Sequence, residues 1–153
     1  MALSDIFNFV QINDQIGTSG QPTEDQFGDA KADGYQVVIN LAPHDPDNNA
    51  LPDEPALMQS LDMEYHHIPI AFDDPRQEHF DAFCAVMEEV GDRKVLVHCA
   101  ANFRVSAMVS SYAVKHLGWS LEQADALVEK LWTSVPGYEM VPVWQAFIDE
   151  ARS

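Results

Sequence analysis

A cysteine and an arginine that lie close together, Cys99 and Arg104, are the residues best suited to chemistry in this sequence. An apolar stretch of strand length precedes Cys99, and an apolar stretch of helix length follows Arg104. We expect the backbone N–H groups of the short loop between them, together with the positive end of the helix, to converge on one anion. The anion-binding residues predicted here are Ala100, Ala101, Asn102, Phe103 and Ser106.

This arrangement would favour both a negatively charged ligand and a negatively charged nucleophile. The guanidinium of Arg104 can hold two oxygens of a tetrahedral oxyanion at once. The same positive surroundings stabilise a thiolate, so we predict that Cys99 is a nucleophile whose pKa lies below about 8.5. The hydroxyl of Ser106 would donate to this thiolate or help to release it. Such a site suits attack on phosphorus or on sulfane sulfur.

The stretch from His98 to Ser106 resembles the active-site loop of the cysteine-dependent protein phosphatases, in which His-Cys is followed by five residues and then by Arg-Ser or Arg-Thr. Segments 18–23, 38–41 and 68–70 are similar to those of a bacterial family of dual-specificity and tyrosine phosphatase-like proteins. The resemblance runs from about Ser4 to the last predicted helix. It implies a hydrolase of phosphate monoesters that forms a phosphocysteine at Cys99 and needs no metal or other cofactor.

One feature departs from the phosphatase pattern. Only four residues separate Cys99 from Arg104, whereas the phosphatases have five between their cysteine and arginine. The spacing from Cys99 to Ser106 keeps the phosphatase value, which would put Val105 where the arginine belongs. Rhodanese-type sulfurtransferases use a loop of four. Two alternatives therefore stay open: a sulfurtransferase or persulfide-handling protein, and a module that binds oxyanions or phosphoproteins without turnover.

The resemblance also implies a general acid, an aspartate on a loop upstream of the nucleophile. Asp73 and Asp74 lie on such a loop, just after a predicted strand. We favour Asp73 because the adjacent Phe72 would bury it and raise its pKa. Asp74 precedes Pro75 and is suited to start a turn.

Other candidate residues have a structural interpretation. We expect His98 to hydrogen-bond the backbone and orient the cysteine loop, and Cys84 to pack on the apolar face of its helix. His66 and His67 would point to opposite faces of a strand, so they cannot both bind one metal ion. We therefore expect no metal site.

Alternating apolar stretches predict the elements that position these residues. Strands are expected at 7–11, 15–19, 35–41, 64–68 and 94–98. Helices are expected at 24–33, 54–61, 77–90 and 104–117. Two more are expected, one that begins near Leu121 and a last one that contains Met140 to Ala151. This order predicts a single α/β domain over residues 1–153, a three-layer sandwich with a central, mainly parallel sheet of about four or five strands between helices. Ligands of such sheets bind beyond the carboxyl ends of the strands, where Cys99 lies.

Composition excludes several partners. The 153 residues include 25 Asp and Glu against 8 Lys and Arg, which gives a net charge of −17. Because nucleic acids and anionic membranes are bound through clustered basic residues, neither is an expected partner. We expect a phosphorylated substrate or another small oxyanion. The first residues include no basic side chain, and two cysteines are too few for a disulfide framework, so we expect a cytoplasmic location.

Overall fold

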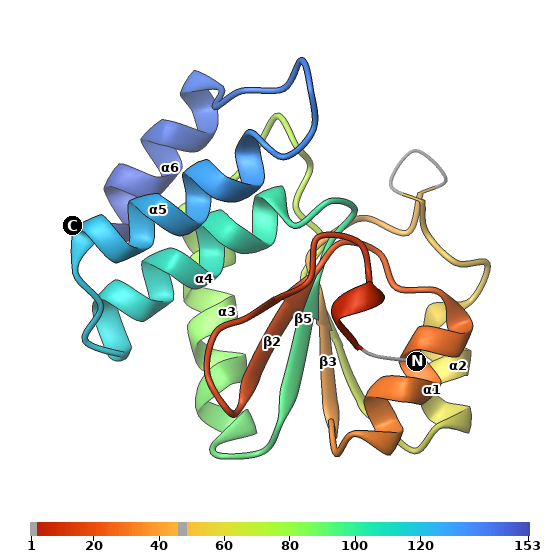
Figure 1. Ribbon diagram of the computed structural model, residues 1–153. Helices are drawn as coiled ribbons and strands as arrows, with labels where there is room; N and C mark the ends of the chain where they lie inside the picture. The colour runs from red at the N-terminus through yellow and green to blue at the C-terminus, as the bar shows by residue number, and fades with distance from the viewer. Residues whose placement is uncertain (1–2, 46–48) are drawn as a thin grey trace.

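A five-stranded sheet forms the centre of the protein. The computed structural model describes residues 3–45 and 49–153. Residues 1 and 2, which belong to the N-terminal segment without basic side chains, lie outside the described residues. The strand order is β1-β2-β5-β3-β4, with β2, β5, β3 and β4 parallel and β1 antiparallel to β2 (Figure 1). The strands are β1 Val10–Gln11, β2 Ile16–Ser19, β3 Val37–Asn40, β4 Glu64–His67 and β5 Val95–His98.

Within the described part of the chain, six α-helices and one 3₁₀ helix accompany the sheet, close to the predicted positions. They are η1 Leu3–Asp5, α1 Glu24–Ala32, α2 Glu54–Ser60, α3 Gln77–Val90, α4 Phe103–His116, α5 Leu121–Trp132 and α6 Pro142–Arg152. Capping boxes at Thr23 and Ser120 fix the starts of α1 and α5. The predicted α/β class with a mainly parallel sheet is confirmed.

Three boundaries differ from the expected ones by more than one residue. The first strand is limited to Val10–Gln11, because the backbone bends between Ile6 and Phe9, where the amide of Phe9 donates to the carbonyl of Ile6. Tyr35 precedes its strand and donates its amide to Ala30 at the end of α1. The last helix begins at Pro142 and not at Met140, since proline is favoured in the first turn of a helix.

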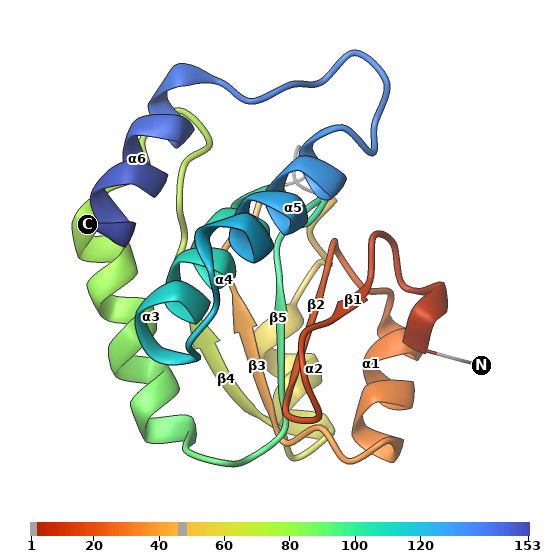
Figure 2. The same ribbon diagram turned by 60° about the vertical axis from the view of Figure 1, so that its left-hand side comes forward.

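The side chains of β3 and β5 alternate between two apolar cores, which is why these two strands read as apolar runs. Val38 and Leu96 pack with Phe27 of α1 and Met58 of α2 on one face. The alternate residues of the same strands, Val37 and Ile39 of β3 and Val95 and Val97 of β5, enter the larger core on the other face. Helices α3, α4, α5 and α6 complete this core. Figures 1 and 2 show the sheet between these two groups of helices.

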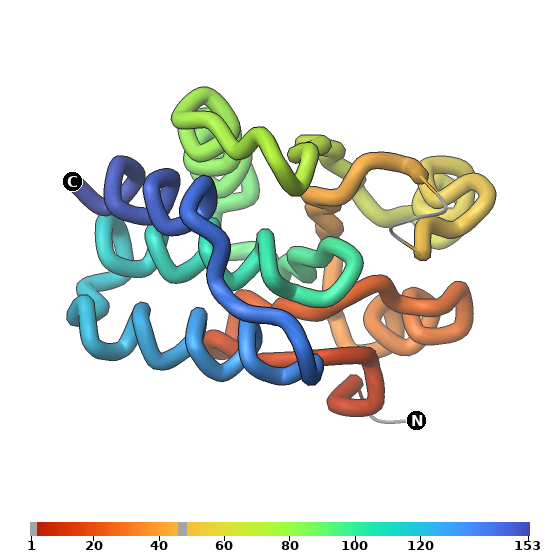
Figure 3. Tube along the Cα trace, turned by 90° about the horizontal axis from the view of Figure 1, so that it is seen from above, coloured from red at the N-terminus to blue at the C-terminus, as the bar shows by residue number. Residues whose placement is uncertain are grey.

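Helix α4 occupies the centre of the larger layer. It packs against α3, α5 and α6 (Figure 3), and most of its residues are buried, including Ser110 and Ser111. This explains why few charged side chains occur in the segment, with Arg104 in its first turn and Lys115 in its last. Since β5 is the middle strand and leads directly into α4, the loop between them lies at the centre of the sheet's carboxyl edge. No helix among the described residues is long and apolar enough to cross a membrane.

Candidate active site

The loop between β5 and α4 forms the floor of a pocket of about 480 Å³. Cys99 and Arg104 both line it, as the sequence predicts for two parts of one site. Its walls come from four separate segments of the chain and are largely apolar. The lining residues are Phe7, Asn49, Phe72, Cys99, Ala100, Ala101, Phe103, Arg104, Val135 and Tyr138.

Every backbone carbonyl from Cys99 to Phe103 is held by a donor. The donors come from the strand, from neighbouring segments and from α4 itself. They are His98 Nδ1 for Cys99 (3.3 Å), the Gln21 amide for Ala100 (3.0 Å), Asn8 Nδ2 for Ala101 (2.9 Å), the Ser106 amide for Asn102 (2.9 Å), and Trp132 Nε1 for Phe103 (3.1 Å).

The backbone N–H groups of residues 100–103, in contrast, are not bonded to other protein groups in the described part of the chain. Among the described residues, no protein acceptor is found for the N–H groups of Ala100, Ala101, Asn102 or Phe103. Asn102 adopts a left-handed conformation (φ 68°), which asparagine tolerates better than most residues. Its Nδ2 donates to the carbonyl of Asn8 at 2.8 Å and to Thr18 Oγ1 at 3.1 Å. The loop thus keeps its carbonyls occupied and its amides available to an anion.

The segment that ends β2 and follows it, residues 19–21, packs against the loop and hydrogen-bonds to it. The amide of Cys99 donates to Ser19, and that of Gln21 donates to Ala100. Gly20 lies so close to the loop that a β-carbon on it would be 2.6 Å from the carbonyl oxygen of Ala100. The glycine is therefore required by close packing. This gives the Ser-Gly-Gln-Pro stretch, which contributed to the family resemblance, a physical role.

Arg104 is directed toward the pocket. The residue is only 4% exposed, and its Nη1 donates to the carbonyl of Ile70 at 2.9 Å. The guanidinium carbon lies 5.7 Å from the centre of the Phe72 ring. Val105, which the spacing to Ser106 put in the arginine position, is instead fully buried in the larger core. Arg104 is therefore the residue that brings positive charge to the pocket.

Ser106 is buried in the first turn of α4. Its hydroxyl donates to the carbonyl of Phe103 at 2.7 Å, a bond that serine often makes to the preceding turn of a helix. In this conformation the hydroxyl supports the shape of the loop.

The two candidate acids lie on the loop between β4 and α3. Trp144 Nε1 anchors this loop by donating to the carbonyl of Phe72 at 2.6 Å. Asp73 is exposed, so the burial expected from Phe72 is not found: the phenyl ring turns toward the pocket, where it packs with Trp132 and Trp144. Asp74 is also exposed and pairs with Arg76 at 2.7 Å. Hydrogen bonds from Arg76 lower the pKa of Asp74, which makes it a poor proton donor.

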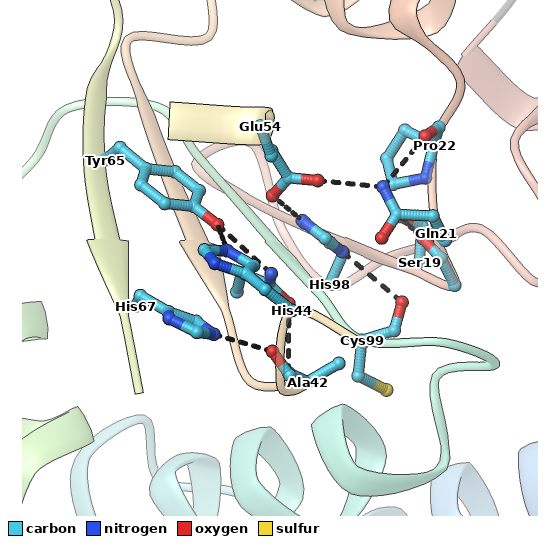
Figure 4. A network of polar contacts seen from close by, with 12 residues as sticks. Ser19, Gln21, Pro22, Ala42, His44, Glu54, Tyr65, His67, His98 and Cys99 are labelled. Carbon is cyan, nitrogen blue, oxygen red and sulfur yellow. Dashed lines mark hydrogen bonds and ion pairs between the residues drawn. The ribbon is translucent and has the colours of Figure 1, made fainter. Parts of the chain in front are cut away.

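A buried ion pair behind the cysteine was not foreseen from the sequence. His98 Nε2 lies 2.7 Å from Glu54 Oε2, and the side chains are 0% and 1% exposed (Figure 4). Gln21 Nε2 donates to the other oxygen of Glu54 at 2.9 Å. Burial by itself would raise the pKa of Glu54, but the hydrogen bonds from His98 and Gln21 and the charge of His98 outweigh it, and the pKa is lowered.

Comparisons with known proteins identify the family. The model of the family described as DSP-PTPase phosphatases fused to NAD⁺ kinase matches residues 11–134. The chain belongs to this phosphatase family. The predicted membership of the cysteine-dependent phosphatase superfamily is thereby confirmed, and the sulfurtransferase alternative gains no support.

Two relatives have substantial sequence identity to this phosphatase-family chain. A Shewanella putrefaciens CN-32 protein of the DUF442 family, described as a candidate phosphatase, is 34% identical with a TM-score of 0.84, and the alignment covers 97% of this chain and 93% of that one. The β-lactamase hydrolase-like protein of Xylella fastidiosa is 30% identical over 100 residues, which are 62% of this chain. The chain spans about a fifth of that relative's length, since the match covers 22% of it.

A more distant structure shares the fold alone. It is TpbA from P. aeruginosa, solved as a cysteine-to-serine variant in complex with pTyr. It is 14% identical with a TM-score of 0.72, and the alignment covers 99% of this chain and 91% of that one.

The remaining histidines and the second cysteine of this phosphatase-family chain lie away from the pocket. His66 pairs with Glu64, and the rings of His44 and His67 stack 3.9 Å apart. Within residues 3–45 and 49–153, no group of three His, Cys, Asp or Glu side chains could hold a metal ion. Cys84 is half-buried on α3 and packs against the larger core, and burial raises its pKa to about 11.

Proposed function

We propose that the protein hydrolyses phosphate monoesters and that Cys99 is the nucleophile. The thiolate attacks phosphorus, the bond from phosphorus to the leaving oxygen breaks, and Asp73 supplies the proton that the leaving oxygen takes up. A water molecule then attacks the phosphocysteine, its proton passes to the Asp73 carboxylate, and phosphate and the free thiolate are released. No metal ion is needed for either step.

One observation carries this proposal. The five consecutive carbonyls of residues 99–103 are all bonded to donors, while Cys99 and Arg104 line the same pocket. A loop built in this way offers amide N–H groups to the oxygens of a phosphoryl group, and preorganised donors of this kind stabilise the charge that develops in the transition state. Arg104 adds a guanidinium that can hold two of those oxygens.

The pocket walls favour an aryl phosphate. Phe7, Phe72 and Tyr138 are among the exposed large apolar residues of the described chain, and all three line this pocket. A flat ring next to the phosphate could pack between them, since aromatic rings gain most from offset or edge-to-face contacts. A ligand with several phosphates is less favoured, because Arg104 is the one basic side chain among the described residues that line the pocket.

The experiment is hydrolysis of p-nitrophenyl phosphate by the wild type, by Cys99→Ser and by Cys84→Ser as the matched control. We expect turnover by the wild type and by Cys84→Ser, and none by Cys99→Ser. Acid quenching during turnover should trap a phosphoryl group on Cys99, visible by intact mass. If wild type and Cys99→Ser are equally inert from about pH 5 to 8, the range in which such acids and bases operate, the catalytic proposal is wrong.

Two further results separate the alternatives. Phosphate binding without turnover would instead indicate a binding module. A mass increase of one sulfur atom on Cys99 after incubation with thiosulfate would indicate persulfide chemistry.

A further inference from the structure

The buried pair of Glu54 and His98 lies next to the cysteine loop, and the proposed mechanism does not use it. Figure 4 shows His98 between Glu54 and Cys99. Glu54 lies 44 positions from His98 in the sequence, in the first turn of α2, and both side chains are shielded from solvent. A charged group in such a place destabilises a fold unless it is paired.

The hydrogen bonds determine the protonation of His98. Nδ1 faces the carbonyl oxygen of Cys99 at 3.3 Å, and a carbonyl can only accept, so Nδ1 carries a proton. Nε2 faces Glu54 Oε2, while Gln21 donates to the other oxygen of the same carboxylate. With Glu54 ionised, Nε2 must carry a proton as well. The ring is then an imidazolium.

We infer that Glu54 is a positioning residue, which holds His98 as an imidazolium behind Cys99 and so favours the thiolate over the thiol. The positive ring lies nearer to Cys99 than the carboxylate does, since His98 is its chain neighbour and bonds to its carbonyl. The inference deepens the proposed function, on which the importance of the thiolate rests.

Several other groups face this pair. Tyr65 on β4 bonds to Glu54, and His67 on the same strand and His44 on the loop after β3 lie beyond it. The edge of Phe27 from α1 contacts the His98 ring, with the ring centres 5.5 Å apart. Arg104, which lines the pocket, is a further cation close to Cys99. Of these groups, Tyr65 has its pKa raised by burial and stays neutral, and His67 has its pKa lowered by burial.

The test is the pH dependence of alkylation of Cys99 by iodoacetamide, in a Cys84→Ser background so that only one thiol reacts. We compare Glu54→Gln with Glu64→Gln, a matched change at an exposed carboxylate that also pairs with a histidine. We expect the midpoint of the Glu54→Gln profile to rise by about one pH unit, which is about tenfold slower alkylation at low pH, while Glu64→Gln leaves it unchanged. The double variant Glu54→Gln with His98→Gln should be no slower than His98→Gln alone.

The direction of the shift is informative. Loss of a negative charge would by itself favour the thiolate and lower the midpoint, so an unchanged or lower midpoint in folded Glu54→Gln overturns the inference. If that variant does not fold, ¹⁵N NMR of the wild type decides: we expect both ring nitrogens of His98 to be protonated at neutral pH, and a neutral ring contradicts the proposal. Alkylation requires no phosphate substrate, so failure of catalysis and failure of this inference are distinguishable.

Discussion

Asp73 and Asp74 are neighbours in the sequence, but their surroundings differ. Arg76 binds the carboxylate of Asp74 through two nitrogens, at 2.7 and 3.0 Å, and favours its ionised form. Asp73 follows Phe72, whose ring lines the pocket. Asp73 therefore remains the better candidate for the acid, because it is next to a pocket residue and Arg76 pairs with Asp74 instead. The burial expected for Asp73 is absent.

Replacing Asp73 tests the assignment. For an alkyl phosphate, whose leaving oxygen is strongly basic, we expect Asp73→Asn to lower kcat by about 10²-fold, within the range of general acid catalysis. For p-nitrophenyl phosphate the loss should be smaller, because the leaving group needs less protonation. Asp74→Asn is the matched control and should keep nearly full activity. Equal losses in both variants with both substrates would exclude a proton donor on this loop.

The role of Arg104 depends on its shape as well as its charge. We expect Arg104→Lys to lower kcat/KM for p-nitrophenyl phosphate by about 10²-fold, because the single nitrogen of an ammonium cannot reproduce the planar fork that bonds Ile70 with one nitrogen and leaves others for phosphoryl oxygens. Arg93→Lys, at a surface arginine paired with Glu64, is the control. Phosphate binding that survives Arg104→Ala undiminished would exclude Arg104 from the anion site.

At the scale of elements, the active loop depends on the turn that follows β2. Strand β2 pairs with β5 in parallel, which brings Ser19 opposite His98 and Gly20 under Ala100. The loop therefore has its shape because two segments about 80 positions apart leave adjacent strands at the same edge, as parallel pairing requires.

This packing predicts opposite effects for two glycines. A β-carbon at Gly20 would displace the backbone of Ala100, so we expect Gly20→Ala to destabilise the fold by about 1–3 kcal/mol and to reduce kcat strongly. Gly28 lies in α1 with open space around it, and Gly28→Ala should stabilise the protein by up to about 1 kcal/mol with unchanged activity. Thermal unfolding and steady-state kinetics measure both. A fully active Gly20→Ala would contradict the proposed support of the loop.

At the scale of the whole molecule, the net charge of −17 works against the site. Among the described residues, carboxylates pair with the basic side chains of Arg76, Arg93, Lys94 and Arg152. At the proposed site, anion binding would therefore rest on the loop amides, the start of α4 and Arg104, within a field that repels anions.

Salt should consequently help binding, or at least not weaken it. Raising NaCl from about 0.01 to 1 M shortens the screening length from about 30 to 3 Å and removes most of the long-range repulsion. We expect KM for p-nitrophenyl phosphate to stay level or fall over this range. The rate of Cys99 alkylation by neutral iodoacetamide serves as the control and should not change. A steep rise of KM with salt would mean that a positive patch dominates binding.

The sequence by itself determined the order of the elements, the α/β class and the loop that carries Cys99. These follow from local causes: apolar periodicity, the capping boxes at Thr23 and Ser120, and a cysteine between an apolar strand and an apolar helix. Only the tertiary structure decided that Arg104 and not Val105 faces the pocket, because the two are neighbours and the spacing to Ser106 fits either. It alone joined Glu54 to His98 and Gln21, since periodicity fixes which face of an element is buried but not which distant segment the strand order brings against it.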